Sequence, residues 1–164
     1  MTVKTFSEFI TTAPGNQSPT GEVITLCDPG NRDWRDYATG PLKDVLSRLK
    51  SVESSAILVV IAALEKGAID GYSYDWSTGC SCVCGTLARI YELNLFNDDI
   101  QETNREEFKK RFGFKPFAYS DMENLAKSIQ PGHTPNNNIF ASALWVLLVM
   151  AYRIRLEFEA NVPS

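Results

Sequence analysis

The chain has 164 residues, of which 44% are hydrophobic and 22% charged, and its formal net charge is −4. This composition is ordinary for a globular protein and excludes a wholly disordered chain. The length suits one domain with a sizeable core, so we expect residues 1–164 to form a single domain with a flexible loop near 11–21 and a short tail at 160–164. A net charge of −4 gives no general sign of the basic face or high pI that is typical of nucleic-acid-binding proteins, so nucleic acid is disfavoured as a partner.

The N-terminal stretch MTVKTFSEFITTAPG is broken by charges and lacks the apolar core of a secretory signal. The longest apolar run, Ile139 to Tyr152, is shorter than the roughly 20 residues of a membrane span. We therefore expect a cytoplasmic protein that does not enter a membrane. Three of the four cysteines fall within five residues, where they cannot bridge one another with good geometry, so we expect reduced thiols.

The N-terminal third alternates turn-rich and apolar segments. Residues 11–21 form a loop by composition, and Glu22 to Cys27 has the pattern of a strand. The segment from Asn31 to Gly40 surrounds Trp34 with mixed charges. It is either a polar binding surface with an aromatic anchor or a solvated loop whose tryptophan packs on the body of the protein.

Helical periodicity dominates the rest of the chain, and start signals mark most of the helices. The final helix is apolar all round between Ile139 and Met150, so we expect it to be central or shared with a partner subunit. The fold class is therefore mainly α, or α+β with a few short strands, around a central apolar C-terminal helix. The expected helices are Pro41 to Lys50, Val52 to Gly67, Thr86 to Leu95, one capped by Asn104, one capped by Ser120, and one from Thr134-Pro135 to Glu159.

The most unusual stretch is Ile69 to Ile90, IDGYSYDWSTGCSCVCGTLARI. It begins with a turn, and Tyr72, Tyr74 and Trp76 then alternate with polar residues, as in a short strand or an extended loop. Cysteines follow immediately before a helical pattern. They therefore lie at or just before a helix N-terminus.

The strings IDGYSY, CSCVCGTLA and IQPGHTPNNN occur in this order, the last of them ahead of a helix with a tryptophan. Together they resemble a group of uncharacterised phage and bacterial proteins with IDG-(S/T)-x-Y, C-x-C-L-x-G-T and I-x-x-G-D-T-P-E-N segments. The resemblance covers roughly residues 60 to 150 and implies a shared fold but no assigned activity; if the chain is phage-encoded, it would work in the host cytoplasm. Cys80, Cys82, Gly85 and Thr86 match the pattern, whereas Cys84 replaces an aliphatic residue and His133 replaces an acid.

A first chemical hypothesis is a zinc site formed by Cys27, Cys80, Cys82 and Cys84, with His133 as a further candidate ligand. Zinc in proteins takes four N or S ligands, usually from C-x₂₋₄-C spacings. In an extended C-x-C-x-C segment the side chains share a face but stand about 6.5 Å apart, which spreads them for a single ion. We expect no other cofactor.

A second hypothesis is a reactive thiol, because a helix N-terminus lowers a cysteine pKa, and Cys82 is the best placed to be activated. The alternative is that these cysteines are small buried side chains that pack a helix start against the apolar helix before it. A third hypothesis is anion binding by the backbone amides of Gly85 and Thr86.

The leading functional hypothesis is a non-catalytic, phage-type accessory protein that binds a protein partner or self-associates, because the chain shows no catalytic set of known mechanism. The alternatives are a cysteine-based metal-binding protein or thiol-dependent enzyme using Cys80, Cys82 and His133, and a protein that sequesters a nucleotide signal. We expect a homodimer through Pro135 to Glu159, because the apolar surfaces around Trp145 and Val146 lie on different sides of that helix. The candidate contact residues are Tyr72, Tyr74, Asp75, Trp76, Cys80, Cys82, Gly85, Thr86 and His133.

Overall fold

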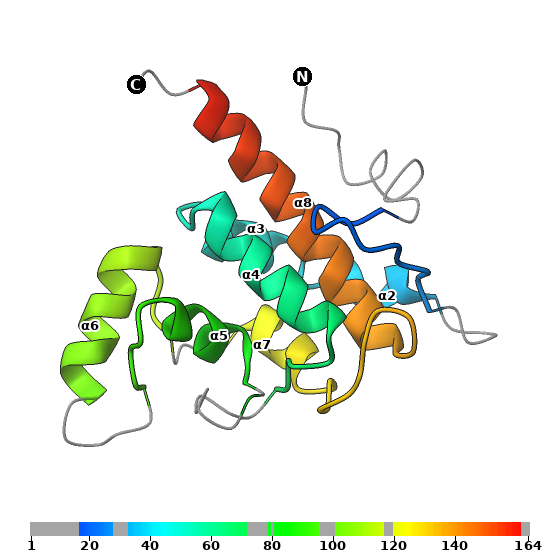
Figure 1. Ribbon diagram of the computed structural model, residues 1–164, viewed down its shortest axis with the longest axis horizontal. Coiled ribbons are helices and arrows are strands. Elements are labelled where there is room, and N and C mark those ends of the chain that lie inside the picture. Colours follow the sequence, from blue (N-terminus) through cyan, green and yellow to red (C-terminus); the bar gives the residue numbers. More distant parts are fainter. Residues whose placement is uncertain are drawn as a thin grey trace.

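The computed structural model describes residues 17–27, 33–71, 79, 81–95, 101–116 and 120–161. These residues are mostly helical and contain no sheet, which confirms the mainly α prediction (Figure 1). The helices are α2 (Trp34–Ala38), α3 (Leu42–Leu49), α4 (Ser54–Glu65), α5 (Val83–Ile90), α6 (Gln101–Phe112), α7 (Asp121–Ala126) and α8 (Ile139–Asn161). The long C-terminal helix, α8, runs diagonally through the molecule, and α6 lies well to one side of it (Figure 1).

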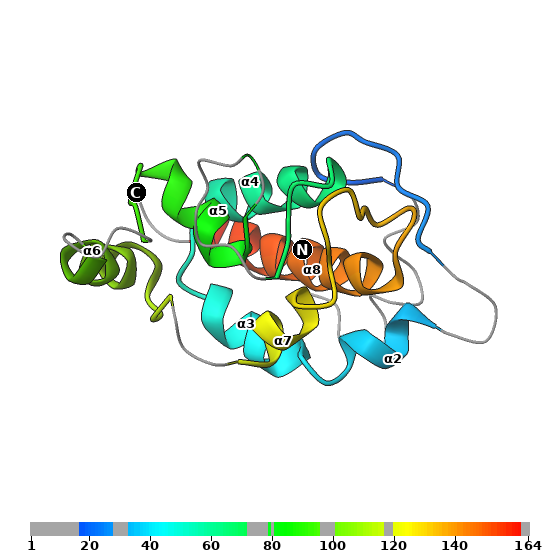
Figure 2. The same ribbon diagram turned by 90° about the horizontal axis from the view of Figure 1, so that it is seen from below.

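Helix α8 is the centre of the core. It lies between α4 on one side and α2, α3 and α7 on the other (Figure 2). Every residue from Ala141 to Ala151 is buried, as the apolar run predicts. Trp145 is fully buried, and its indole N–H donates to a carboxylate oxygen of Glu65 at 2.7 Å. A single chain thus covers all sides of this part of α8, which removes the uncovered surface from which we predicted a dimer. The dimer itself stays a prediction.

By length and composition alone, α8 is also apolar enough to cross a membrane, although its apolar run is short. Its most apolar 18-residue window has a mean hydropathy of 1.7, and 67% of that window is buried inside the chain's own fold. The core helix of a soluble protein has the same properties, so this feature is weak evidence for a membrane span.

A contact between distant segments holds the start of α4. The carboxylate of Glu159, near the end of α8, accepts hydrogen bonds from the backbone N–H of Ser54 at 3.0 Å and from the Ser54 hydroxyl. Arg155 pairs with Glu159 at 3.2 Å and donates to the carbonyl of Lys50 at 3.2 Å. An acidic side chain from another helix thus satisfies a free amide at the N-terminus of α4.

The predicted strand from Glu22 to Cys27 is wrong. The only β pairing of this segment among the described residues is an isolated antiparallel bridge between Val23 and Gln17. The amides of Thr25 and Cys27 donate to Asn136 Oδ1 at 2.7 Å and to the Pro135 carbonyl at 3.1 Å. The segment therefore pairs with the turn before α8, and none of the described residues forms a strand beside it.

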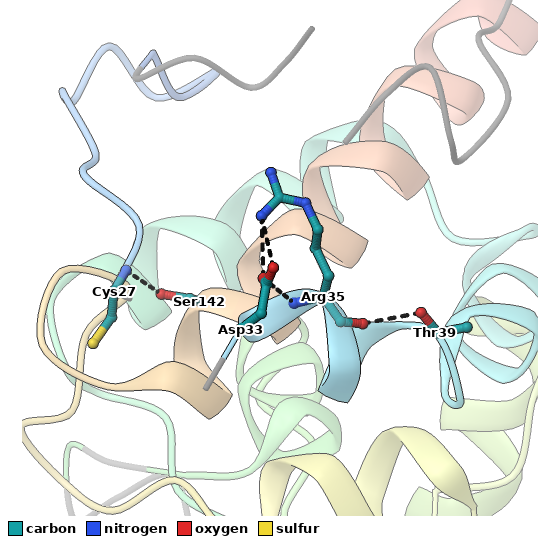
Figure 3. A network of polar contacts seen from close by, with 5 residues as sticks. All are labelled: Cys27, Asp33, Arg35, Thr39 and Ser142. Atoms are coloured by element: carbon teal, nitrogen blue, oxygen red, sulfur yellow. Dashed lines mark hydrogen bonds and ion pairs between the residues drawn. The ribbon is translucent and has the colours of Figure 1, made fainter. Parts of the chain in front are cut away.

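The region around Trp34 is a short helix, where we predicted a loop or a polar binding surface. Asp33 caps α2 by accepting from the amide of Arg35 at 2.9 Å and also pairs with its side chain (Figure 3). Trp34 is buried, so the tryptophan packs on the body of the protein. Its neighbours Arg35 and Asp36 remain exposed.

Several helix boundaries also differ from the prediction. Helix α5 is Val83–Ile90 and not Thr86 to Leu95, because Cys82 caps its earlier start and Glu92 has a positive φ of 55° just after its end. Helix α8 begins at Ile139, where Asn138 Oδ1 accepts from the amide of Ala141, because the Thr134-Pro135 segment forms a separate turn. It ends at Asn161, so residues 160 and 161 are helix and not tail. Asn104 lies inside α6 and does not cap it; its amide nitrogen donates to the carbonyl of Asn94. Helix α7 has the predicted Ser120 cap, with a 3.2 Å bond from the amide of Glu123.

Candidate functional site

The three motif segments of the predicted site meet in space. Ile69 and Ser81 form a parallel bridge, with the amide of Asp70 donating to the Ser81 carbonyl at 3.0 Å. The amide of Gly132 donates to the Gly67 carbonyl at 2.8 Å. We call this region, comprising residues 67–71, 81–86 and 123–132, the motif junction. It brings together the end of α4, the start of α5, and α7 with the turn after it.

Two glycines are required by how closely these backbones approach. Gly67 has a φ of +74°, and a Cβ at this position would lie 2.9 Å from the Cα of Gly132. A Cβ on Gly71 would lie only 2.1 Å from the Cα of Lys127 and 2.5 Å from the carbonyl oxygen of Ala126. Backbone atoms cannot rotate away as a side chain can. A side chain at either position would push these backbones apart, so the motif junction needs both glycines.

Cys82 is the N-cap of α5. Its sulfur accepts a hydrogen bond from the amide of Gly85 at 3.3 Å, and the side chain is 1% exposed. Burial, and then the negative charge of Glu123, raise the pKa of the Cys82 thiol. This environment disfavours the activated thiolate predicted at Cys82, because the desolvation cost exceeds the stabilisation from the amides at the helix N-terminus.

Cys84 forms a buried hydrogen bond with an acidic residue of α7. Its thiol donates to Glu123 Oε1 at 3.2 Å, and Cys84 is 1% exposed. Burial raises the pKa of Cys84, and burial also raises the pKa of Glu123, although the Cys84 thiol and the charge of Arg48 stabilise the carboxylate. Cys82 and Cys84 are thus small buried side chains at the start of α5, which agrees with the alternative interpretation of these cysteines.

The amides proposed to bind an anion already have acceptors within the protein. The amide of Gly85 donates to Cys82 Sγ, and the amide of Thr86 donates to the Cys82 carbonyl at 2.9 Å. The Thr86 hydroxyl donates to the same carbonyl and lies 2.9 Å from the Ser81 hydroxyl. Both Gly85 and Thr86 are buried. The structure therefore does not support an anion site at these two amides.

The candidate zinc ligands that the structure describes do not converge. Cys27 lies beside the start of α8, where its amide donates to the Ser142 hydroxyl at 2.8 Å (Figure 3). His133 closes its own turn by accepting from the amide of Gln130 at 3.1 Å. Among the described residues, no group of three or more His, Cys, Asp or Glu side chains could hold a metal. Five predicted contact residues lie outside the described residues: Tyr72, Tyr74, Asp75, Trp76 and Cys80.

A second candidate site lies at the far end of α8, and the sequence analysis missed it. The last turns of α8 extend past the other helices (Figure 1), and a groove of about 360 Å³ separates them from α3. Phe158 is 56% exposed at its edge. The sequence pattern that could have revealed this site is the pair Ile154 and Phe158, which are spaced as on one helix face and lie beyond the apolar run. We call this the α3–α8 groove; its apolar lining is Leu46, Leu49, Ala151, Ile154 and Phe158.

The remaining lining of the α3–α8 groove is polar or basic: Lys50, Ser51 and Arg155. Arg155 stacks over the Phe158 ring at 4.8 Å while it pairs with Glu159. Lys50 is exposed and makes no ion pair with any described residue. The groove thus combines an apolar floor with a basic rim.

No protein-family profile matches this chain, and neither a curated protein nor a solved structure is significantly similar to it.

Proposed function

We propose that this protein is a non-catalytic accessory protein that acts by binding another macromolecule, and that the α3–α8 groove is the contact surface. The observation that carries the proposal is the exposure of a large aromatic, Phe158, beside an apolar groove at the end of the central helix. Exposed apolar residues that gather around a groove are typical of interaction sites, and aromatic and Arg side chains are enriched in interfaces. Leu156 is also 45% exposed on α8 but does not line the groove.

The environment of the motif junction supports a structural role for its described cysteines. Cys82 and Cys84 are buried, and burial raises the pKa of both thiols, so neither favours the thiol-dependent alternative. The resemblance to uncharacterised phage and bacterial proteins supports the phage-type part of the proposal, with the host cytoplasm as the place of action. In this view the motif junction maintains the fold and the α3–α8 groove binds the partner.

Site-specific photocrosslinking in bacterial cells tests the proposal. A photoreactive phenylalanine analogue replaces Phe158, and a matched chain carries it at Val23, which is also apolar and is 73% exposed but lies outside the groove. We expect discrete adducts, heavier than the 18.3 kDa chain, from position 158 only. An adduct at twice the chain mass would identify self-association as the binding event. Absence of adducts from position 158, or identical adducts from both positions, would overturn the proposal.

A further inference from the structure

The residues that line the α3–α8 groove carry a charge opposite to that of the whole protein. Two of them, Lys50 and Arg155, are basic, and none is acidic, although the chain has a formal net charge of −4. Glu159 balances part of the Arg155 charge, but this carboxylate is turned toward Ser54. Lys50 therefore contributes the least compensated charge on the rim.

Two exposed lysines that do not line the groove lie on segments next to its lining residues. Gly113 packs directly on Ser51, because a Cβ at Gly113 would lie 2.9 Å from the Cβ of Ser51. Lys115 is exposed two residues later, and its carbonyl accepts from Arg48 at 3.5 Å. On α3, Lys43 is exposed and lies two helical turns from Lys50, on the same side of the helix.

We propose that the α3–α8 groove binds an acidic amphipathic helix of a partner protein, whose apolar side chains lie on the groove floor and whose carboxylates face Lys50. This inference rests on the proposed function and adds the chemistry of the partner. An open groove between two helices is the usual receptor for an amphipathic helix, which places apolar residues at i, i+3 or i+4, and i+7 into it. Complementary charge on the rim then selects the partner.

The charge pattern also argues against a second copy of this chain as the occupant. Two-fold pairing brings the same surface of each copy together. Two α3–α8 grooves face to face would place Lys50 and Arg155 of one copy against the same basic residues of the other. Like charges placed together across an interface are unfavourable, so a separate acidic segment is the better fit.

The test uses the full-length protein and two synthetic peptides of roughly 15 residues, about four helical turns. Both peptides carry leucines at helical spacing; one has glutamates on its flanks and the other has lysines at the same positions. Fluorescence anisotropy should show the acidic peptide binding at least about tenfold more tightly, equivalent to roughly 1.4 kcal/mol. Lys50→Glu should reverse this preference. Lys110→Glu, which alters an exposed lysine on α6, is the matched control and should change affinity less than about twofold, because it lies outside the groove.

Four outcomes would overturn this inference. Equal binding of both peptides, or equal effects of Lys50→Glu and Lys110→Glu, would show that rim charge does not select the partner. Binding to vesicles with anionic headgroups that exceeds binding to the acidic peptide would assign the groove to a lipid surface. A 36 to 37 kDa species at low concentration that Lys50→Glu leaves intact and Phe158→Asp dissociates would assign it to a second copy, as twice the 18.3 kDa chain mass. In the last case crosslinks from position 158 would still support the proposed function, whereas the lipid outcome would overturn both.

Discussion

Replacing Glu159 with glutamine should destabilise the protein, because this carboxylate joins the end of α8 to the start of α4. Glu159 accepts two hydrogen bonds from Ser54 and pairs with Arg155 at 3.2 Å. Loss of a helix N-cap costs about 0.5–2 kcal/mol, and a surface ion pair at i,i+4 adds roughly 0.3–0.5 kcal/mol. Glutamine keeps an oxygen that can accept one bond, so we expect a loss of about 1 kcal/mol at neutral pH, which for a chain of this size lowers Tm by roughly 2–4 °C.

The pH dependence separates the charge of Glu159 from its shape. Partial burial alone would raise the Glu159 pKa, but hydrogen bonds from Ser54 and the charge of Arg155 outweigh it and lower the pKa below its usual 4.5. The unfolded chain therefore binds this proton at higher pH than the folded chain, so the stabilisation is present above the usual pKa and disappears as pH falls through the lowered one. Urea denaturation of the wild type and Glu159→Gln should converge in acid. Glu157→Gln is the control, and equal losses in both variants at neutral pH would refute the reasoning.

Three further predictions concern the motif junction and the His133 turn that follows it. Gly71→Ala should lower the stability of the fold by more than the roughly 1–3 kcal/mol typical of overpacking, because its Cβ would meet the backbone of Lys127. Gly40→Ala is the control and should not do so, because the space around Gly40 is open. Thermal denaturation measures the difference between the two variants. Burial raises the pKa of Glu123 above 4.5, so the folded chain keeps a proton that the unfolded chain loses, and stability falls as pH rises through this interval. Glu123→Gln should remove that fall in pH-dependent urea titrations. His133→Asn should change stability by about 0.5 kcal/mol or less, and a much larger loss would indicate a buried partner.

The sequence predicted those parts of the fold that depend on local patterns. The amphipathic period gave α3, the Ser120 cap gave the start of α7, and the apolar run gave the buried centre of α8. Each of these signals operates within a few residues along the chain. The predicted strand from Glu22 to Cys27 failed because its hydrogen-bond partners, Pro135 and Asn136, lie more than 100 residues away.

The candidate site was harder to predict because its properties depend on burial and on distant contacts. A helix N-terminus favours a thiolate at Cys82, but burial and the charge of Glu123, which belongs to another helix, raise its pKa instead. The α3–α8 groove requires α3 and α8 to be placed side by side, which neither segment specifies alone. Ile154 and Phe158 nevertheless share one helical face, so continuing the periodicity past Tyr152 would have identified an apolar surface there.

A charged substitution at Trp145 distinguishes a core position from a subunit interface, and the structure predicts a core position. Trp145 is fully buried within one chain and donates to Glu65 at 2.7 Å. Replacing Trp145 with a charged residue removes a large side chain from the core, which lowers the stability by about 3–5 kcal/mol. It also places an unpaired charge in the core. Trp145→Glu should therefore unfold the chain, as seen in the loss of its helical circular dichroism signal. A folded Trp145→Glu monomer of 18.3 kDa by light scattering, derived from a wild-type dimer, would instead place Trp145 at a subunit interface and contradict its position in the core.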